Sequence, residues 1–193
     1  WFLVGSNTNA QYPLEGFLFP DTYQFYIGDS AKGVFRRFLA RFDDIFTDEL
    51  KAYVESSKYS LYDIMIVASM IEKESAGSSE NYDISSVIYN RLTNQKEHPF
   101  LNIDATLMYV LGHKDALTNE DLAIDSPYNT NIYRGLIPGP ISNPGLNSIN
   151  AALNPDSTKY HYYVLDTKAE ERQHHFSETY DEHVNFINKL KEG

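Results

Sequence analysis

Glu74 is the residue whose type and position in this sequence most favour acid–base chemistry. It continues an apolar stripe in which Ile64, Val67 and Ile71 recur at helical spacing. A carboxyl group on such a face is partly buried, and burial disfavours its charged form. The negative end of the helix dipole acts in the same direction. We therefore expect a raised pKa at Glu74, which suits a general acid that protonates a leaving oxygen, as in glycoside cleavage.

A helix from Ser60 to Gly77 would position this carboxyl group. Ser60, with Asp63 three residues later, comes close to a capping box and marks the start of the helix. Gly77 fits the left-handed residue that commonly follows a helix end. Glu74 then lies in the last turn, and Glu72, about 200° away around the helix axis, points elsewhere. In the alternative interpretation, Glu74 lies at the helix edge, where it reaches solvent or pairs with a Lys or Arg.

The composition restricts the class of protein. The chain has 193 residues, which is enough for one domain with a proper core. Its net charge of -11 argues against nucleic acids and acidic membrane surfaces as partners, because binding to phosphates requires basic residues. The absence of cysteine excludes disulfides and thiolate metal sites. The longest uncharged apolar run, 64–71, is far too short to cross a bilayer. Since the chain begins with Trp1, an upstream targeting or membrane segment stays compatible with the sequence.

Helical patterns dominate the rest of the chain, and each has a recognisable cap or stop. Asp104 is a candidate cap for one helix that ends at Gly112, and Thr118 for a short acidic turn. Two β-branched and aromatic segments, 161–166 and 173–177, read as strands paired across a charged turn. The expected fold is α+β, a predominantly helical domain over residues 1–193 with a small antiparallel sheet. The remaining predicted helices are 30–46, 47–54, 81–92, 147–153 and 179–190.

Residues 126–147 form a long segment rich in Pro, Gly and Asn, without a regular pattern. A loop of this length inside a domain is usually either functional or disordered. Its prolines and aromatic residues favour an ordered loop. We interpret it as the wall of a binding groove, with a surface wrap that contacts no ligand as the alternative. The chain has 15 tyrosines, and amphipathic rings suit sugar or protein surfaces as well as cores.

Three histidines close in sequence, His174, His175 and His183, raise a metal hypothesis. Their spacing matches no helical HExxH pattern. His174 and His175 would also point to opposite faces of a strand. We therefore do not predict a metal site.

Eight ordered segments of the sequence resemble the YceG-like endolytic murein transglycosylases. This resemblance runs from Leu14 to Leu190, and it places the family's catalytic glutamate, which precedes Ser or Thr in a Glu-Lys-Glu-Ser/Thr segment, on Glu74. The segments are LEGFLFPDTY, ASMIEKESA, VIYNRL, DATLMY, SPYNTN, GLIPGPISNPGLNSINAALNP, YYVLD and HHFSETYDEHV.

The resemblance implies a lyase that cuts peptidoglycan glycan strands between N-acetylmuramic acid and N-acetylglucosamine, without a cofactor. One carboxyl group would serve first as acid and then as base, closing a 1,6-anhydro ring, so no second catalytic carboxylate is needed. Asp104 is the acid that a hydrolysing muramidase, the first alternative, would use beside Glu74. Tyr128 and Asn129 are the expected sugar contacts. The second alternative is a peptidoglycan-binding or scaffold module.

The resemblance also implies a cellular setting. Family members carry an N-terminal membrane anchor and a LysM-like region before the part that this chain matches. The chain is therefore expected to be the catalytic portion of a single-pass, membrane-anchored protein that acts on the extracytoplasmic side. Its expected partners, besides glycan strands, are the cell-wall synthases or the elongation machinery, with a role in terminating nascent strands.

Overall fold

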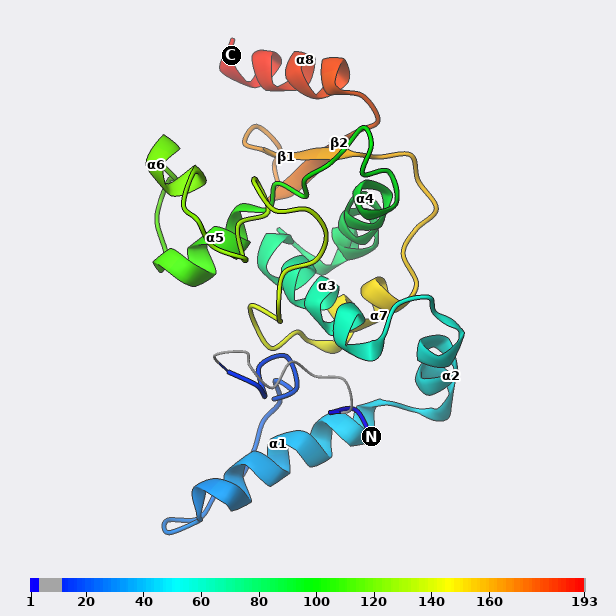
Figure 1. The fold of residues 1–193 in the computed structure, drawn as a ribbon, viewed down its shortest axis with the longest axis vertical. Helices are drawn as coiled ribbons and strands as arrows, with labels where there is room; N and C mark the ends of the chain where they lie inside the picture. Colours follow the sequence, from blue (N-terminus) through cyan, green and yellow to red (C-terminus); the bar gives the residue numbers. More distant parts are fainter. Residues whose placement is uncertain (4–11, 193) are drawn as a thin grey trace.

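The computed structural model describes residues 1–3 and 12–192, and its fold is α+β and mostly helical (Figure 1), as predicted. Helices α1 and α8 lie at opposite ends of the long axis, and α3 lies between them. The elements, in chain order, are α1 (Ala31–Ile45), α2 (Asp48–Ser56), α3 (Leu61–Glu74), a 3₁₀ turn (Ser78–Glu80), α4 (Asn81–Thr93), α5 (Asp104–Leu111), α6 (Asn119–Leu122), α7 (Leu146–Leu153), β1 (Tyr162–Asp166), β2 (Gln173–Ser177) and α8 (Tyr180–Lys191).

Helix α3 forms the centre of the core. Every side chain from Ile64 to Ile71 is buried, so this helix is apolar around its whole circumference rather than along one stripe. It packs against α4, α5 and α7. Ser69 is the polar exception, and its hydroxyl donates to the Ile66 carbonyl at 2.7 Å and accepts from the Ile141 amide at 3.0 Å. The second bond joins the helix to the long loop.

The start of α3 is confirmed, whereas the predicted role of Gly77 is wrong. Ser60 and Asp63 form a full capping box, and Glu74 is the last helical residue. The chain then leaves the helix at Ser75 in an extended conformation, and Gly77 is also extended, with φ of -166°. The Ser75 hydroxyl contacts the Gly77 carbonyl and the Asn81 side chain. Side-chain bonds therefore close this turn, and no left-handed residue is needed.

The cap of α5 also differs from the prediction. Asp104 is the first helical residue, and the N-cap is Ile103, whose side chain forms no capping bond. An acid in the first turn is still favoured by the helix dipole. The helix ends as predicted, with Gly112 following at φ of 84°. The N-terminus of α5 thus keeps backbone N–H groups that no local side chain satisfies.

The two predicted strands pair antiparallel, with Tyr162 opposite Ser177 and Asp166 opposite Gln173. Helix α8 packs against both strands and begins with the predicted capping box of Thr179. The other predicted helices are confirmed, with ends shifted by no more than two residues. Within residues 1–3 and 12–192, no helix is both long and apolar enough to span a membrane.

The loop between α6 and α7 is irregular but ordered, and it contributes to the core. Ile137 and Ile141 each retain only 3% exposure. Near its start, the Thr130 carbonyl and hydroxyl accept from the amides of Asn102 and Ile103, at 3.1 and 2.9 Å. The loop therefore holds the segment that leads into α5.

Alanine substitutions at two glycines test how closely the N-terminal segment packs on this loop. Gly16 and Gly28 both have positive φ, 90° and 98°, but a Cβ at Gly16 would lie 2.6 Å from Pro140 Cγ, whereas nothing lies within 4 Å at Gly28. Each Gly→Ala change should cost about 1 kcal/mol in backbone conformation. Gly16→Ala should cost about 1–3 kcal/mol more, because the methyl group overlaps the proline ring. Urea unfolding measures both, and equal losses would contradict this packing.

Candidate active site

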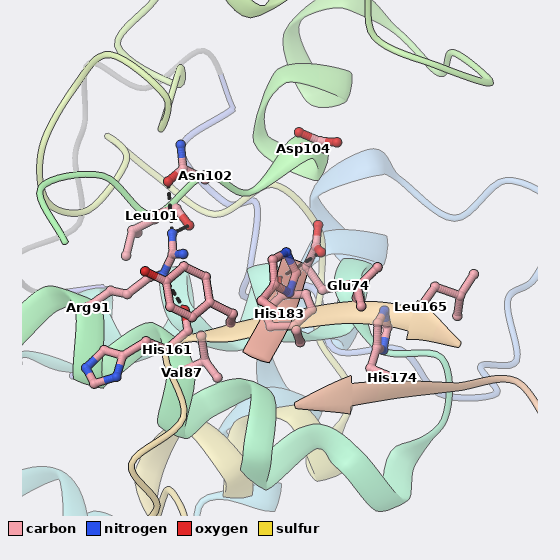
Figure 2. A pocket seen from close by; sticks show the side chains of 13 residues that line it. Glu74, Val87, Arg91, Leu101, Asn102, Asp104, His161, Leu165, His174 and His183 are labelled. Carbon is pink, nitrogen blue, oxygen red and sulfur yellow. Dashed lines mark hydrogen bonds between the residues drawn. The ribbon is translucent and has the colours of Figure 1, made fainter. Parts of the chain in front are cut away.

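A cavity of about 300 Å³ lies along β1, and Glu74 is one of its lining residues (Figure 2). Its other walls come from α4, the start of α5, β2 and α8. The segment that carries Leu101, Asn102 and Asp104 lies across from β1, on the side away from β2. The cavity is thus bounded by elements from both halves of the chain.

The Glu74 carboxyl group is held by two donors from different elements. Its Oε2 accepts from the Tyr163 hydroxyl of β1 at 3.0 Å, and its Oε1 accepts from the Ala105 amide at 3.3 Å. Ala105 lies in the first turn of α5, so Glu74 satisfies one of the N–H groups left free at that helix end. The C-terminus of α3 and the N-terminus of α5 therefore meet at this carboxyl group.

The environment raises the pKa of Glu74 above its ordinary value. Burial is the largest cause, and the charge of Asp104 acts in the same direction. The bonds from Tyr163 and Ala105 oppose this shift, because they stabilise the carboxylate. The carboxyl group is thus favoured in its acid form but has two donors in place for its charged form. Both forms are needed by a residue that first gives and then takes a proton.

Tyr163 remains a hydrogen-bond donor over a wide pH range. Burial and the neighbouring Glu74 charge raise the pKa of its hydroxyl well above the ordinary value. Its ring contacts His174 edge to face, with the centroids 5.3 Å apart. The phenol therefore stays protonated and oriented toward the carboxylate.

His174 is in turn held by a buried acid. Glu80, which is 7% exposed, accepts from the His174 amide at 2.9 Å and pairs with His174 Nδ1 at 2.7 Å. Burial alone would raise the pKa of Glu80, but bonds from the His174 and Ala76 amides and from the His174 ring lower it overall. Glu80 is therefore a carboxylate that fixes the imidazole beside Tyr163.

Arg91 joins the two walls of the cavity. Its Nε donates to the His161 carbonyl at 2.6 Å, and its Nη1 donates to the Leu101 carbonyl and to Asn102 Oδ1, both at 2.9 Å. Asn102 has φ of 55°, an uncommon conformation for a residue other than glycine. Strained backbone of this kind is concentrated at functional sites. Arg91 thus sets the spacing between β1 and the segment before α5.

Among the predicted site residues, Asp104 lines the cavity with Glu74, whereas Tyr128 and Asn129 do not. Burial raises the pKa of Asp104. Asn129 is fully buried, and its side chain bonds to the carbonyls of Leu122 and Ile124, at 3.0 and 2.9 Å. Tyr128 packs on another tyrosine ring outside the cavity. We therefore do not include Asn129 or Tyr128 in the candidate site.

The other acid of the Glu-Lys-Glu-Ser segment, Glu72, has a structural role. Glu72 Oε2 accepts from the Gly145 amide at 3.1 Å and from the Ser148 hydroxyl at 2.6 Å, at the start of α7. It points away from Glu74's partners, as predicted. Within the described residues, Glu74 itself forms no ion pair with a Lys or Arg, which argues against that alternative.

The three neighbouring histidines have separate surroundings. His174 bonds to Glu80, and His175 stacks on Phe186 at 3.7 Å on the opposite face of β2. His183 lines the cavity from α8. In residues 1–3 and 12–192, no cluster of three or more His, Cys, Asp or Glu side chains has the arrangement of a metal site.

Tyr163 and Arg91 are functional candidates that the sequence analysis did not single out. Both lie in segments that carry the family resemblance, YYVLD and VIYNRL. That resemblance was the available signal. Their roles depend on contacts with residues far away in sequence, which no local pattern contains.

Comparisons with known proteins agree on one family. The model of the YceG-like family matches residues 4–189. The endolytic murein transglycosylase of Bacillus subtilis is 39% identical over 187 residues, which are 96% of this chain and 49% of that protein. The endolytic murein transglycosylase of Streptococcus pneumoniae is 31% identical over 83% of this chain and 29% of that protein.

A solved structure agrees with this result. The crystal structure of a YceG-like protein from Listeria monocytogenes superimposes with a TM-score of 0.81 at 37% identity, over 96% of this chain and 58% of that one. The chain thus spans about half or less of the two transglycosylases that it matches.

Glu74→Gln should change how stability depends on pH. A carboxyl group whose folded pKa lies above its ordinary value of 4.5 favours folding below that value and loses this contribution as the pH rises through the folded pKa. A glutamine stays neutral. The variant should therefore gain stability over the wild type at neutral pH, and the gain should disappear well below pH 4.5. Urea unfolding across this range measures it; a pH-independent difference would contradict the raised pKa.

Tyr163→Phe should raise the pKa of Glu74 further. The substitution keeps the ring but removes the hydroxyl that stabilises the carboxylate. Carbon-13 NMR titration of the glutamate carboxyl groups measures the shift, with Glu74→Gln identifying the signal. Tyr162→Phe is the matched control, because Tyr162 has no bond to Glu74 in the structure. An unchanged or lowered pKa in Tyr163→Phe would refute the assigned donor.

Proposed function

Because the chain belongs to the YceG-like family, we propose that it is the catalytic part of an endolytic murein transglycosylase, with Glu74 as its acid and base. The observation that carries the proposal is the Glu74 carboxyl group. It lines a cavity, its pKa is raised by burial, and two fixed donors face its oxygens. The proposed substrate is the glycan strand of peptidoglycan, cut within the strand between N-acetylmuramic acid and N-acetylglucosamine.

In the first half of the reaction, protonated Glu74 gives its proton to the glycosidic oxygen. The bond between this oxygen and C1 of the muramyl sugar breaks, positive charge develops at C1, and the N-acetylglucosamine end leaves as an alcohol. The Tyr163 hydroxyl and the Ala105 amide then stabilise the carboxylate that forms. Its charge also faces the positive end of the α5 dipole.

In the second half, the Glu74 carboxylate accepts the proton of the muramyl 6-hydroxyl as that oxygen bonds to C1. The product is a 1,6-anhydro ring, and Glu74 returns to its acid form without consuming water. One carboxyl group therefore suffices, unlike the pair in hydrolysing glycosidases. We further propose that these cuts terminate nascent strands.

The position of Asp104 favours one alternative, a hydrolysing muramidase. Asp104 lines the same cavity and influences the pKa of Glu74. In a hydrolase it would activate a water molecule, and the product would carry a reducing end instead of an anhydro ring. The two reactions share the first step and differ in what attacks C1.

We propose that the protein acts at the outer side of the cell membrane, held there by a segment outside this chain. The relatives named murein transglycosylases are longer than this chain, and their substrate lies in the cell wall. Cell-wall synthases or the elongation machinery are the proposed protein partners.

Mass spectrometry of glycan strands incubated with the wild type and with Glu74→Gln tests the function. The wild type should produce 1,6-anhydro-muramyl ends, and the variant should cleave about a hundred to ten thousand times more slowly, because it lacks the general acid. Glu72→Gln is the matched control on the same helix and should keep most of the activity, since a glutamine oxygen still accepts from Gly145 and Ser148.

Normal cleavage by Glu74→Gln would refute the assignment of the acid. Reducing ends from the wild type, lost in Asp104→Asn, would establish the muramidase instead. Binding of strands without cleavage by either protein, also in a longer chain with the proposed N-terminal segment, would favour a binding or scaffold module.

A further inference from the structure

The free edge of β1 faces the cavity beside Glu74. Within the described residues, β1 pairs with β2 alone, and all five residues from His161 to Leu165 line the cavity. A strand edge carries a row of backbone donors and acceptors that can pair with another extended chain. Here the edge is enclosed by the segment that carries Asn102 and Asp104, which lies across from it (Figure 2).

The hydrogen bonds of β2 indicate which groups of β1 point into the cavity. The His174 amide donates to Glu80 at 2.9 Å, and therefore away from β1. His174 lies opposite Leu165. In an antiparallel ladder, opposed residues exchange either both backbone bonds or neither. Leu165 therefore directs its N–H and C=O toward the free edge, and Tyr163, two residues earlier, does the same.

A cation without an acidic partner lies at the other end of this edge. Arg91 lines the cavity, and none of the ion pairs among residues 1–3 and 12–192 includes it. Its Nε and Nη1 donors are used by oxygens of the two walls, whereas Nη2 has no protein partner in the described part of the chain. His161 and His183 lie on the same cavity, and a ring nitrogen of His183, Nδ1, is buried without a partner.

The cavity holds a basic side chain, Arg91, although the protein has a net charge of -11. The acids of the cavity, Glu74 and Asp104, lie near the middle of the view, and Arg91 and His161 lie to their left (Figure 2). A partly desolvated guanidinium group is best satisfied by a planar carboxylate. The free strand edge can form hydrogen bonds with an extended main chain, and the guanidinium group can bind an anion.

We propose that this edge binds the acidic peptide that is attached to the muramyl sugar, as an added strand along Tyr163 and Leu165 with a carboxylate at Arg91. The inference rests on the proposed function, because it assigns a second part of the same substrate. The peptide starts from the sugar whose glycosidic bond would lie at Glu74, and both Glu74 and the strand edge line this cavity. An acetamido group alone would use one donor and one acceptor of the edge and would place no anion at Arg91.

Binding of a free peptide tests the inference without any cleavage. Nitrogen-15 NMR of the chain would be followed during titration with L-Ala-γ-D-Glu-L-Lys and with the same peptide amidated at its carboxylates. The acidic peptide should shift the amide signals of Tyr163 and Leu165 and the Nε signal of Arg91. The amidated peptide should bind about tenfold more weakly, since a charge-assisted bond is lost.

Shifts confined to other residues, or equal affinity for the two peptides, would overturn the inference even if strand cleavage is confirmed. Conversely, the expected shifts would keep the peptide site even if no cleavage is found, with this chain or with a longer chain that includes the N-terminal region, in which case the proposed reaction is refuted. The two failures are therefore distinguishable.

Two substitutions at one position test the strand edge in turnover. Leu165→Pro removes the outward N–H, which proline tolerates on an edge strand, and Leu165→Val keeps it. Leu165→Pro should lower the ratio of kcat/KM for peptide-bearing over amidase-stripped strands about threefold to tenfold, the effect of one hydrogen bond. Leu165→Val should leave this ratio unchanged. An equal loss on both substrates in a folded variant would overturn the inference. Circular dichroism checks that Leu165→Pro folds, and if it does not, the peptide titration of the wild type remains the test.

Discussion

The burial of α3 on all sides is the constraint on which the rest of the structure depends. A helix with no solvent-facing stripe must be enclosed, and here α4, α5, α7 and the long loop enclose it. Its polar end residue then emerges at a place that the enclosure determines. Glu74 comes out of the core where α5 begins and β1 crosses, so the position of one carboxyl group follows from the packing of the whole domain.

The chemistry of Glu74 arises from contributions that oppose one another. Burial and the nearby Asp104 favour the acid form, while Tyr163 and the α5 N-terminus favour the carboxylate. A site with only the contributions that favour the acid form would be a poor base. A site with only those that favour the carboxylate would be a poor acid. Glu80 and His174 contribute indirectly, because Glu80 bonds to His174 and His174 packs against the Tyr163 ring. The network extends from the buried contact between Glu80 and His174 to the Glu74 carboxyl group.

Features that depend on neighbours in sequence were predicted well. The Ser60 capping box, the helix that ends at Glu74 and the alternation of His174 and His175 are local, and the structure confirms them. The cap assigned to Gly77 was wrong because side-chain bonds of Ser75 close the turn, and the cap assigned to Asp104 was wrong because Glu74, from another helix, accepts from an amide of the first turn. Tyr163 could not be derived from pattern, since its partner lies 89 residues earlier.

The bridge that Arg91 makes between the two cavity walls has a consequence for biogenesis. Helix α3 and Arg91 are synthesised before the His161 carbonyl and the Tyr163 hydroxyl, which lie nearer the C-terminal end of the chain. Until the C-terminal hairpin folds back, the carboxyl group lacks its phenol donor and the cavity lacks one wall. A nascent or truncated chain therefore holds the Glu74 carboxyl group without the surroundings on which the proposed chemistry depends.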